Sequence, residues 1–231
     1  MRQPLLEVIV TSVEDAREAE QGGAGRLELV RDLASDGFTP SPALVSQVVR
    51  AVRVPVRVMV RETPAHEVRD PRLLAGLRQT VGGLAQLPID GLVLGFLDRG
   101  RVDLPAVRSL LAEAPSLPVT FHRAFEELID AGEGFAALAA CGQFDRVLHS
   151  GGSGSWDDRR TRLAELARAP GPRLGLIAGG GLTLDGLARL RGTPGLSEFH
   201  VGRAARDPAT PAGAVRARLV AALVHALGDS R

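Results

Sequence analysis

The sequence contains no lysine: its 28 basic side chains are all arginine, and its 231 residues include one cysteine and no tyrosine. Without lysine the chain cannot form the Schiff base of an imine-forming aldolase or of a pyridoxal phosphate enzyme, and it cannot carry a P-loop. The single cysteine, Cys141, excludes an intrachain disulfide, a CxxC redox pair and a thiolate-rich zinc site. Proton transfer is therefore left to histidine and carboxylate groups, and cationic binding to arginine.

Aromatic residues and net charge are also low, at 3% and +1. Few side chains are available to stack on bases, and no strong positive charge attracts nucleic acid. No apolar run approaches the ~20 residues of a membrane-spanning helix. Glu7 comes too early for the apolar core of a signal peptide. We therefore expect no nucleic-acid partner, no membrane partner and a cytoplasmic location.

Short apolar, β-branched runs alternate along the chain with stretches of helical spacing. The runs predict strands at Leu5–Val10, Arg26–Val30, Val54–Val60, Gly91–Gly95, Leu117–His122, Asp145–His149, Arg173–Ala178 and Ser197–Val201. The stretches predict helices at Val13–Gln21, Pro42–Val52, Pro71–Leu87, Pro105–Ala114, Gly134–Cys141, Arg159–Ala169, Leu184–Arg191 and Ala212–Leu227. Ser41-Pro42 is a helix start signal, and Gly22-Gly23 is a helix stop signal.

These strand–helix pairs favour an α/β fold, a single (β/α)8 TIM barrel that forms one domain over residues 1–231. A doubly wound open sheet is the alternative. It usually has fewer strands, and no Gly-x-Gly-x-x-Gly fingerprint follows the first predicted strand. The barrel is therefore the preferred prediction.

Polar residues at the strand ends are the candidates for catalysis, because the active site of a barrel lies where the strands run into the following loops. Side chains alternate faces along a strand, so Glu198 and His200 share a face, as do Thr120 and His122, and Val147 and His149. If these faces point inward, carboxylates and imidazoles converge in one cavity. The candidate catalytic residues are Glu7, Glu28, His122 and His200. The alternative is a structural layer of paired buried charges.

Glycines after the seventh and eighth predicted strands indicate an anion site. Gly180 and Gly181 precede a predicted helix, and Gly202 precedes Arg203. Loops at these two strands expose backbone N–H groups and form the usual phosphate site of the fold. The candidate anion-binding residues are Arg61, Arg123, Ser150, Gly180, Gly181, Gly202 and Arg203.

These residues offer, as one alternative, an enzyme of lyase, isomerase or hydrolase type that acts on a small anionic or phosphorylated metabolite. His122 or His200, tuned by Glu7 or Glu28, would act as general acid or base. Proton abstraction beside a carbonyl and hydrolysis both fit these groups. A barrel that keeps the polar core without activity is a further alternative.

Several motifs resemble those of the CutC family: Leu6-Glu7-Val8, Gly23-Ala-Gly-Arg-Leu-Glu-Leu29, Gly37-Phe-Thr-Pro-Ser41, Thr120-Phe-His-Arg-Ala-Phe125, Arg146-Val-Leu-His-Ser-Gly151, Ala178-Gly-Gly-Gly181 and Glu198-Phe-His200. The resemblance covers nearly the whole chain in order. It implies a TIM barrel, a cytoplasmic protein, a homodimer or other small homo-oligomer, and a role in copper homeostasis with copper as the bound ion.

The sequence departs from the family pattern at positions that bear on copper. Where the family has cysteine after the first-strand Glu and after the second-strand Glu-Leu, this chain has Ile9-Val10 and Val30. Cu(I) prefers thiolate or thioether ligands, and Met59 is the one soft candidate near the barrel axis. Three imidazoles could instead offer nitrogen to Cu(II) or Zn(II), so the predicted metal ligands are His122, His149 and His200.

Overall fold

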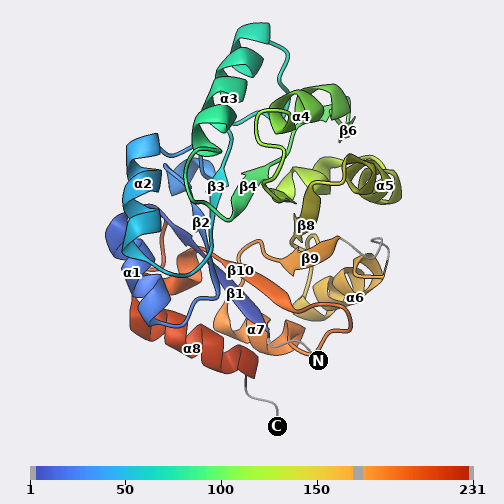
Figure 1. Cartoon of the computed structure of the whole chain (residues 1–231). Helices are drawn as coiled ribbons and strands as arrows, with labels where there is room; N and C mark the ends of the chain where they lie inside the picture. Colours follow the sequence, from blue (N-terminus) through green and yellow to red (C-terminus); the bar gives the residue numbers. More distant parts are fainter. Residues whose placement is uncertain (1–3, 169–173, 229–231) are drawn as a thin grey trace.

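In a computed structural model, which describes residues 4–168 and 174–228, parallel strands close into a barrel that helices surround (Figure 1). The strand order around the barrel is β1-β10-β9-β8-β7-β4-β3-β2. The barrel strands are β1 (Leu5–Val10), β2 (Arg26–Leu29), β3 (Val56–Met59), β4 (Gly91–Leu94), β7 (Val119–Phe121), β8 (Phe144–His149), β9 (Gly175–Ala178) and β10 (Glu198–Val201). The α/β TIM barrel predicted from the sequence is therefore confirmed.

Each barrel strand is followed by a helix that packs on the outside of the barrel (Figure 1). The helices are α1 (Val13–Gln21), α2 (Pro42–Ala51), α3 (Pro71–Leu84), α4 (Leu104–Leu111), α5 (Ala131–Cys141), α6 (Trp156–Leu166), α7 (Leu184–Leu190) and α8 (Ala217–Gly228). The ring closes where β1 pairs with β10, and α1 packs against α8 beside this seam. Within the described residues, no helix has the length and apolar character needed to cross a membrane.

The start and stop signals act as the sequence predicts. The Ser41 hydroxyl accepts a hydrogen bond from the Leu44 N–H at 3.2 Å, with Pro42 in the first turn of α2. Helix α1 ends at Gly22, and the next residue, Gly23, has φ of +91°. Only glycine adopts this left-handed backbone readily, so the chain can turn there from α1 toward β2.

The last predicted helix begins five residues later than expected, because the segment before it forms a hairpin of β11 (Arg206–Asp207) and β12 (Ala214–Val215). The buried Asp15 carboxylate holds this hairpin by accepting hydrogen bonds from the Val215 N–H and the Arg206 guanidinium, each at 2.9 Å. The other predicted elements differ from the observed ones by a few residues at their ends, and two predicted ends, Ala169 and Arg173, lie outside the described residues.

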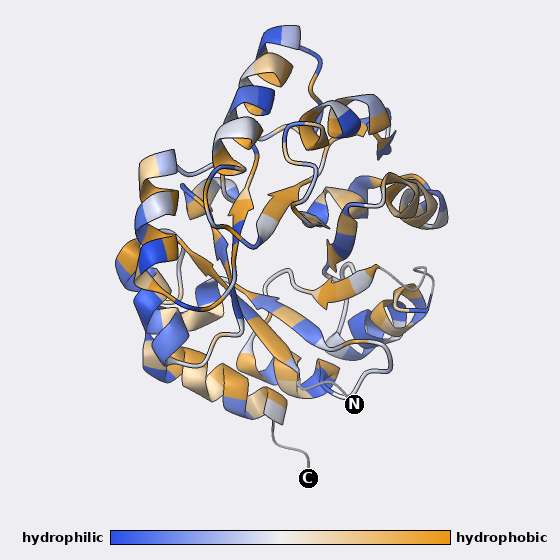
Figure 2. Cartoon of the chain, viewed as in Figure 1, coloured by the Kyte–Doolittle hydropathy of each residue, from blue (hydrophilic) through white to orange (hydrophobic). Residues whose placement is uncertain are grey.

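The apolar core lies between the strands and the helices. Val8, Leu27 and Phe199 are almost completely buried there, as are apolar residues of every surrounding helix. Figure 2 shows helices whose hydrophobic and hydrophilic residues alternate, as expected where one face packs on the barrel. The inside of the barrel is different, since charged side chains fill much of it.

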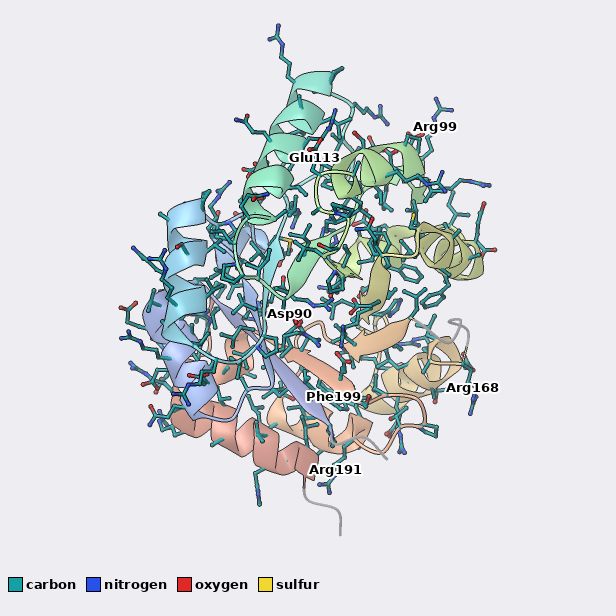
Figure 3. The ribbon with its side chains drawn as sticks, in the orientation of Figure 1. Asp90, Arg99, Glu113, Arg168, Arg191 and Phe199 are labelled. Carbon is teal, nitrogen blue, oxygen red and sulfur yellow. The ribbon has the colours of Figure 1, made fainter. Side chains whose placement is uncertain are left out.

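On the amino-terminal side of the interior, arginines and carboxylates from different strands pair. The Arg57 guanidinium binds both carboxylate oxygens of Asp145 at 2.7 Å, and Arg26 and Arg146 both donate to Glu198, at 2.7 and 2.6 Å. Figure 3 labels Asp90, a further partner of Arg57, inside the ring of strands, and Arg99, Glu113 and Arg168 at its periphery. These charges satisfy one another, so this half of the interior is the structural polar layer that the sequence offered as an alternative.

Candidate functional site

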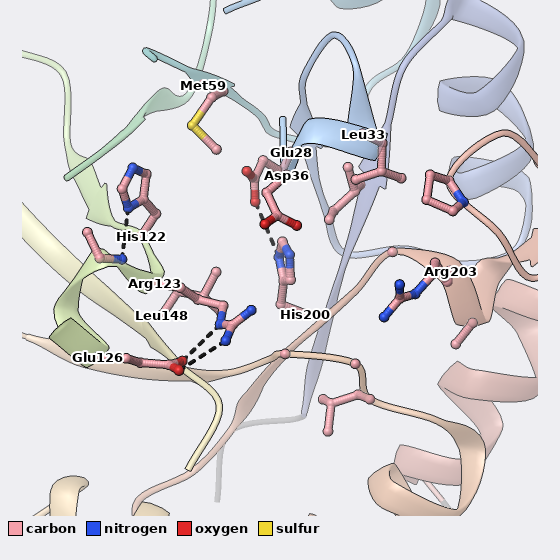
Figure 4. A pocket seen from close by; sticks show the side chains of 18 of the residues that line it. Glu28, Leu33, Asp36, Met59, His122, Arg123, Glu126, Leu148, His200 and Arg203 are labelled. Carbon is pink, nitrogen blue, oxygen red and sulfur yellow. Dashed lines mark hydrogen bonds and ion pairs between the residues drawn. The ribbon is translucent and has the colours of Figure 1, made fainter. Parts of the chain in front are cut away.

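A cavity of about 750 Å³ opens at the carboxyl ends of the strands (Figure 4). It is lined by residues near the carboxyl ends of β1, β2, β3, β8 and β10 and by the loops that follow β2, β3, β7, β9 and β10. This volume lies in the ordinary range of small-molecule sites. Its position is the one where barrels carry their active sites.

At the floor of the cavity Glu7, Glu28 and His200 form one cluster. The His200 Nδ1 lies 2.7 Å from Glu7 Oε1 and 3.3 Å from Glu28 Oε2. Parallel pairing of β1 with β10 sets Glu7 directly beside His200. Glu28 and His200 line the cavity, whereas Glu7 lies one layer deeper and also accepts a hydrogen bond from the Arg26 Nε. The side chains of Glu7, Glu28 and His200 therefore point inward, which is the condition under which the sequence predicted that carboxylates and an imidazole converge.

Two of these groups are held in their charged forms. Burial alone would raise the pKa of Glu7, but the Arg26 guanidinium and the His200 ring lower it well below its usual value. Burial would likewise lower the pKa of His200, but Glu28 and Glu7 raise it above its usual value. Near neutral pH this arrangement favours an ionised Glu7 beside a protonated His200.

Glu28 differs from Glu7, although the two carboxylates share a histidine. Burial, followed by the repulsion of Glu7, raises the pKa of Glu28 to about 7, and His200 and Arg26 only partly offset this. A carboxyl group with a pKa near the working pH can both accept and release a proton. Of the residues that line the cavity, Glu28 has the properties of a general acid or base.

His122 lies on the β7 side of the cavity, where its orientation is fixed. Its Nδ1 accepts a hydrogen bond from the Ala124 N–H at 3.1 Å, so the neutral ring carries its proton on Nε2. This Nε2 is buried and has no partner among the described residues. Burial, together with His66 and Arg61, lowers the pKa of His122 to about 3, so the ring is neutral. Gly95 allows this placement, since a Cβ there would lie 2.6 Å from the ring.

The opposite part of the cavity carries the predicted anion groups of β9 and β10. Gly180 and Gly181 both have positive φ, and together with Gly202 and Arg203 they line the cavity. Arg203 is exposed and begins a short 3-10 helix, η3 (Arg203–Ala205). Its guanidinium makes no hydrogen bond or ion pair within the described part of the chain. The backbone N–H groups and this guanidinium are thus available to an anion.

Arg123 reaches the same cavity, but a carboxylate already binds it. Its guanidinium donates two hydrogen bonds to Glu126, at 2.9 and 3.0 Å, from the 3-10 helix η2 (Arg123–Glu127). Glu126 also accepts hydrogen bonds from the Ser150 N–H and hydroxyl. Ser150 therefore lies behind the cavity wall, and its observed contacts position Glu126.

The loops after β8 and β9 are tied together by an arginine that the sequence did not single out. Arg159 is 8% exposed and donates to the carbonyl oxygens of Ser150, Gly179 and Gly180. The turn is tight, because a Cβ on Gly180 would lie 2.4 Å from that of Ser150. Arg159 and Gly180 thus fix the turn that presents the backbone of Gly181.

Arg61 lines the cavity as predicted, but its guanidinium is occupied by its own loop. It donates to the carbonyl oxygens of Thr63 at 3.0 Å and Pro64 at 2.6 Å. Its observed hydrogen bonds therefore hold the loop after β3. This loop also brings His66 to the cavity, where its ring centroid lies 5.1 Å from that of His122.

The structure does not bring the three predicted metal-binding imidazoles together. At the carboxyl end of β8 Leu148 lines the cavity, so the alternation there turns His149 outward with the fully buried Val147. His149 contacts the edge of Phe125, and its Nδ1 accepts a hydrogen bond from the Gly151 N–H. Among the described residues, Glu7, Glu28 and His200 form the group whose ligand atoms lie close enough, within 4.8 Å, to hold one ion.

Soft metal ligands are nearly absent from the cavity. Cys141 is the last residue of α5 and packs against the outer core. Because a barrel helix runs from the cavity side back to the amino ends of the strands, Cys141 lies away from the cavity, and it is not among the residues that line it. Met59 supplies the one thioether of the lining. Cu(I) favours thiolate and thioether ligands, so this donor set does not fit a Cu(I) ion. The carboxylate–imidazole cluster has the donor types that Cu(II) or Zn(II) accepts.

A closed parallel barrel with a polar cavity at the carboxyl ends of its strands is a TIM-barrel protein. The model of the CutC family matches residues 4–205, and the chain belongs to this family. The resemblance noted in the sequence is thereby confirmed.

The relatives match over most of their length. A family protein CutC from Xanthomonas campestris is 36% identical over 222 residues, which are 96% of this chain and 87% of that protein. A Mus musculus protein named copper homeostasis protein cutC homolog is 37% identical over 205 residues, 88% of this chain and 75% of that protein. The crystal structure of CutC from Streptococcus agalactiae has a TM-score of 0.79 at 25% identity, covering 86% of this chain and 98% of that one.

Proposed function

We propose that the cavity is an acid–base site for a small anionic ligand, such as a phosphorylated or carboxylated metabolite. The observation that carries this proposal is Glu28, a buried carboxyl group with a pKa of about 7 that faces the same cavity as Arg203 and the Gly180–Gly181 turn. Strongly shifted pKa values in a cavity are typical of functional sites. The lyase, isomerase and hydrolase classes predicted from the sequence all use such a group.

In this proposal Glu28 takes a proton from the ligand or returns one. Its neighbour His200, whose pKa Glu28 and Glu7 raise, offers a fixed positive charge that stabilises negative charge on the ligand. Arg26 and Glu7 act through His200 and do not touch the ligand, since neither lines the cavity. Catalytic contact would thus be limited to Glu28, His200 and the neutral His122.

The charge balance around the β8–β10 loops supports an anionic ligand. Arg159 and Arg162 donate to backbone carbonyl oxygens and form no ion pair within the described residues. The Arg203 guanidinium is likewise unpaired there, and Glu126 forms its ion pair with Arg123. A surplus of positive charge beside exposed backbone N–H groups attracts and orients an anion.

A role in copper homeostasis is the second candidate, because relatives of this chain carry that name. The specific observation in its favour is the Glu7–Glu28–His200 cluster. These residues would hold Cu(II) or Zn(II) as cargo only after His200 gives up its Nδ1 proton, so binding would weaken in acid. Arg26 beside Glu7 opposes a second positive charge at this place.

The two candidates separate in one experiment on the full chain purified without a histidine tag. Phosphate or sulfate at 100 times its dissociation constant would stabilise the wild-type fold by about 2.7 kcal/mol. For a chain of this size that raises Tm by roughly 5–10 °C. Arg203→Ala should abolish the shift, whereas Arg50→Ala, which removes the same charge from exposed α2, should retain it.

Metal analysis of the same untagged samples completes the test. Stoichiometric copper or zinc in the wild type that His200→Ala removes, together with no phosphate shift, would favour the copper candidate. A phosphate shift with no bound metal supports the anion site. The predicted cytoplasmic location and small homo-oligomer stay predictions, and sedimentation of the untagged chain tests the second.

A further inference from the structure

One wall of the cavity is apolar and separate from the main core. Ile9, Leu33 and Met59 line the cavity and pack with the buried Val30 and Val93 in a small cluster of their own. Ile9 and Leu33 are only partly buried, and the surface they leave uncovered faces the cavity. An apolar surface of this kind gains free energy when a ligand displaces water from it.

The apolar wall and the cationic groups occupy different sides of the cavity. In Figure 4 Met59 and Leu33 lie in the upper part of the view, and Arg123 and Arg203 lie in the lower part. In the same view Glu28 lies beside Asp36 on the side of Leu33, and its ion pair with His200 is drawn as a dashed line. A ligand that touches both sides therefore occupies the same cavity as this acid–base pair.

The two sides are close enough for one small molecule to span. A Cβ built on Gly202, the residue before Arg203, would lie 3.1 Å from Ile9 Cδ1 and 4.0 Å from Leu33 Cδ2. The apolar wall thus reaches the backbone that leads into the anion groups. Asp36 lines the cavity on the side of Leu33 and would repel an anionic group there (Figure 4). This charge sets the direction in which an anion can enter.

We infer that the ligand is an amphiphilic anion: its anionic group lies at Arg203 and the Gly180–Gly181 turn, and its apolar group lies against Ile9, Leu33 and Met59. This inference rests on the proposed anion site and goes beyond it, because it states the chemistry of the rest of the ligand. A phosphorylated metabolite with no apolar group would leave the apolar wall in contact with water and would gain no free energy from it.

The test measures the affinity of the untagged full chain for methyl, ethyl and n-butyl phosphate by calorimetry. All three esters have the same charged group, so the anion site treats them alike. Each methylene group that leaves water contributes ~0.8 kcal/mol, or roughly fourfold in the dissociation constant. We expect n-butyl phosphate to bind at least about tenfold more tightly than methyl phosphate.

Leu33→Ser and Ile9→Thr should reduce this ratio toward one. Ile129→Ser, a matched control at a side chain that is 79% exposed and outside the cavity, should leave the ratio unchanged. Two variants are used so that the test still stands if one of them fails to fold, which its circular dichroism spectrum would show.

Each result is decisive. Equal affinities for methyl and n-butyl phosphate overturn the amphiphilic ligand and leave the anion site standing. A ratio that survives both Leu33→Ser and Ile9→Thr also overturns it, because the chain would then bind elsewhere. If neither ester nor sulfate binds, the proposed anion site fails, and the inference fails with it.

Discussion

Replacing Glu28 with glutamine should make the protein more stable at pH 8 while it removes the proposed acid–base group. Glu28 is 3% exposed, and burial raises its pKa to about 7, from an ordinary value of 4.5. Above pH 7 the folded protein therefore holds a carboxylate that would be more stable in water. Glutamine has nearly the same shape and no charge, so Glu28→Gln removes this cost.

The magnitude follows from the shift in pKa. A shift of about 2.5 pKa units corresponds to ~3 kcal/mol, since each unit is 1.36 kcal/mol. The folded state binds the proton more tightly than the unfolded state, so wild-type stability falls as the pH rises from 4.5 to 7. The advantage of Glu28→Gln should thus be ~3 kcal/mol at pH 8 and less than ~1 kcal/mol at pH 5.

Urea unfolding of both proteins at pH 5 and pH 8 measures this difference. Glu126→Gln is the matched control, because burial of Glu126 is outweighed by Arg123 and Ser150, which lower its pKa. The same chemical change should therefore destabilise the protein at pH 8 when made at Glu126. If the free energy of unfolding of Glu28→Gln exceeds that of the wild type by no more at pH 8 than at pH 5, the carboxyl group of Glu28 has an ordinary pKa. The proposed acid–base site is then refuted.

Three further predictions concern the surroundings of this group. Glu7→Gln should destabilise the fold by about 3–5 kcal/mol in urea at pH 7, since it removes the charge that the buried Arg26 and His200 both bind and leaves Arg26 with Glu198 alone; because the pKa of Glu7 is lowered, the loss should shrink below pH 4.5. Gly180→Ala should lower the free energy of unfolding by about 1–3 kcal/mol and weaken phosphate binding, because the φ of residue 180 is +72° and the new Cβ would clash with the Cβ of Ser150. Unchanged stability and unchanged phosphate binding would contradict this. His122, with a pKa of about 3, should keep a neutral ring in NMR spectra from pH 8 to pH 5, and a titration near pH 6.5 would disprove its burial.

The barrel could be predicted because its signals are local. Each strand is a short apolar run, and the helices have periodic patterns, several with a capping residue of their own, such as Ser41 before α2. The inward face of β10 could also be predicted, since Glu198 and His200 are polar and Phe199 between them is apolar. Where all polar residues of a strand lie on one face, the alternation of side chains is enough to predict which residues point inward.

Strand β8 shows why this reasoning fails elsewhere. Its sequence, Phe-Asp-Arg-Val-Leu-His, has polar and apolar residues on both faces, so the pattern does not tell which face is inside. Inward packing of Leu148 turns His149 outward. The register is set by pairing with β7 and β9, which the residue pattern within β8 does not describe.

The roles of several loop residues could not be predicted from the sequence either. The roles of Arg159, Glu126 and the guanidinium of Arg61 depend on hydrogen bonds to backbone groups whose positions the loops determine. Periodicity contains no information about such loops. His66 had one usable signal, because it follows the third strand and so belongs to a loop at the cavity end of the barrel.

A crystal structure of the untagged protein soaked in n-butyl phosphate tests the central claim most directly. We expect the phosphate group at Arg203 and the Gly180–Gly181 turn, the alkyl chain against Ile9 and Leu33, and Glu28 beside the ligand. A cavity that stays free of the ester at saturating concentration, or an ester bound elsewhere on the protein, would contradict the proposed anion site.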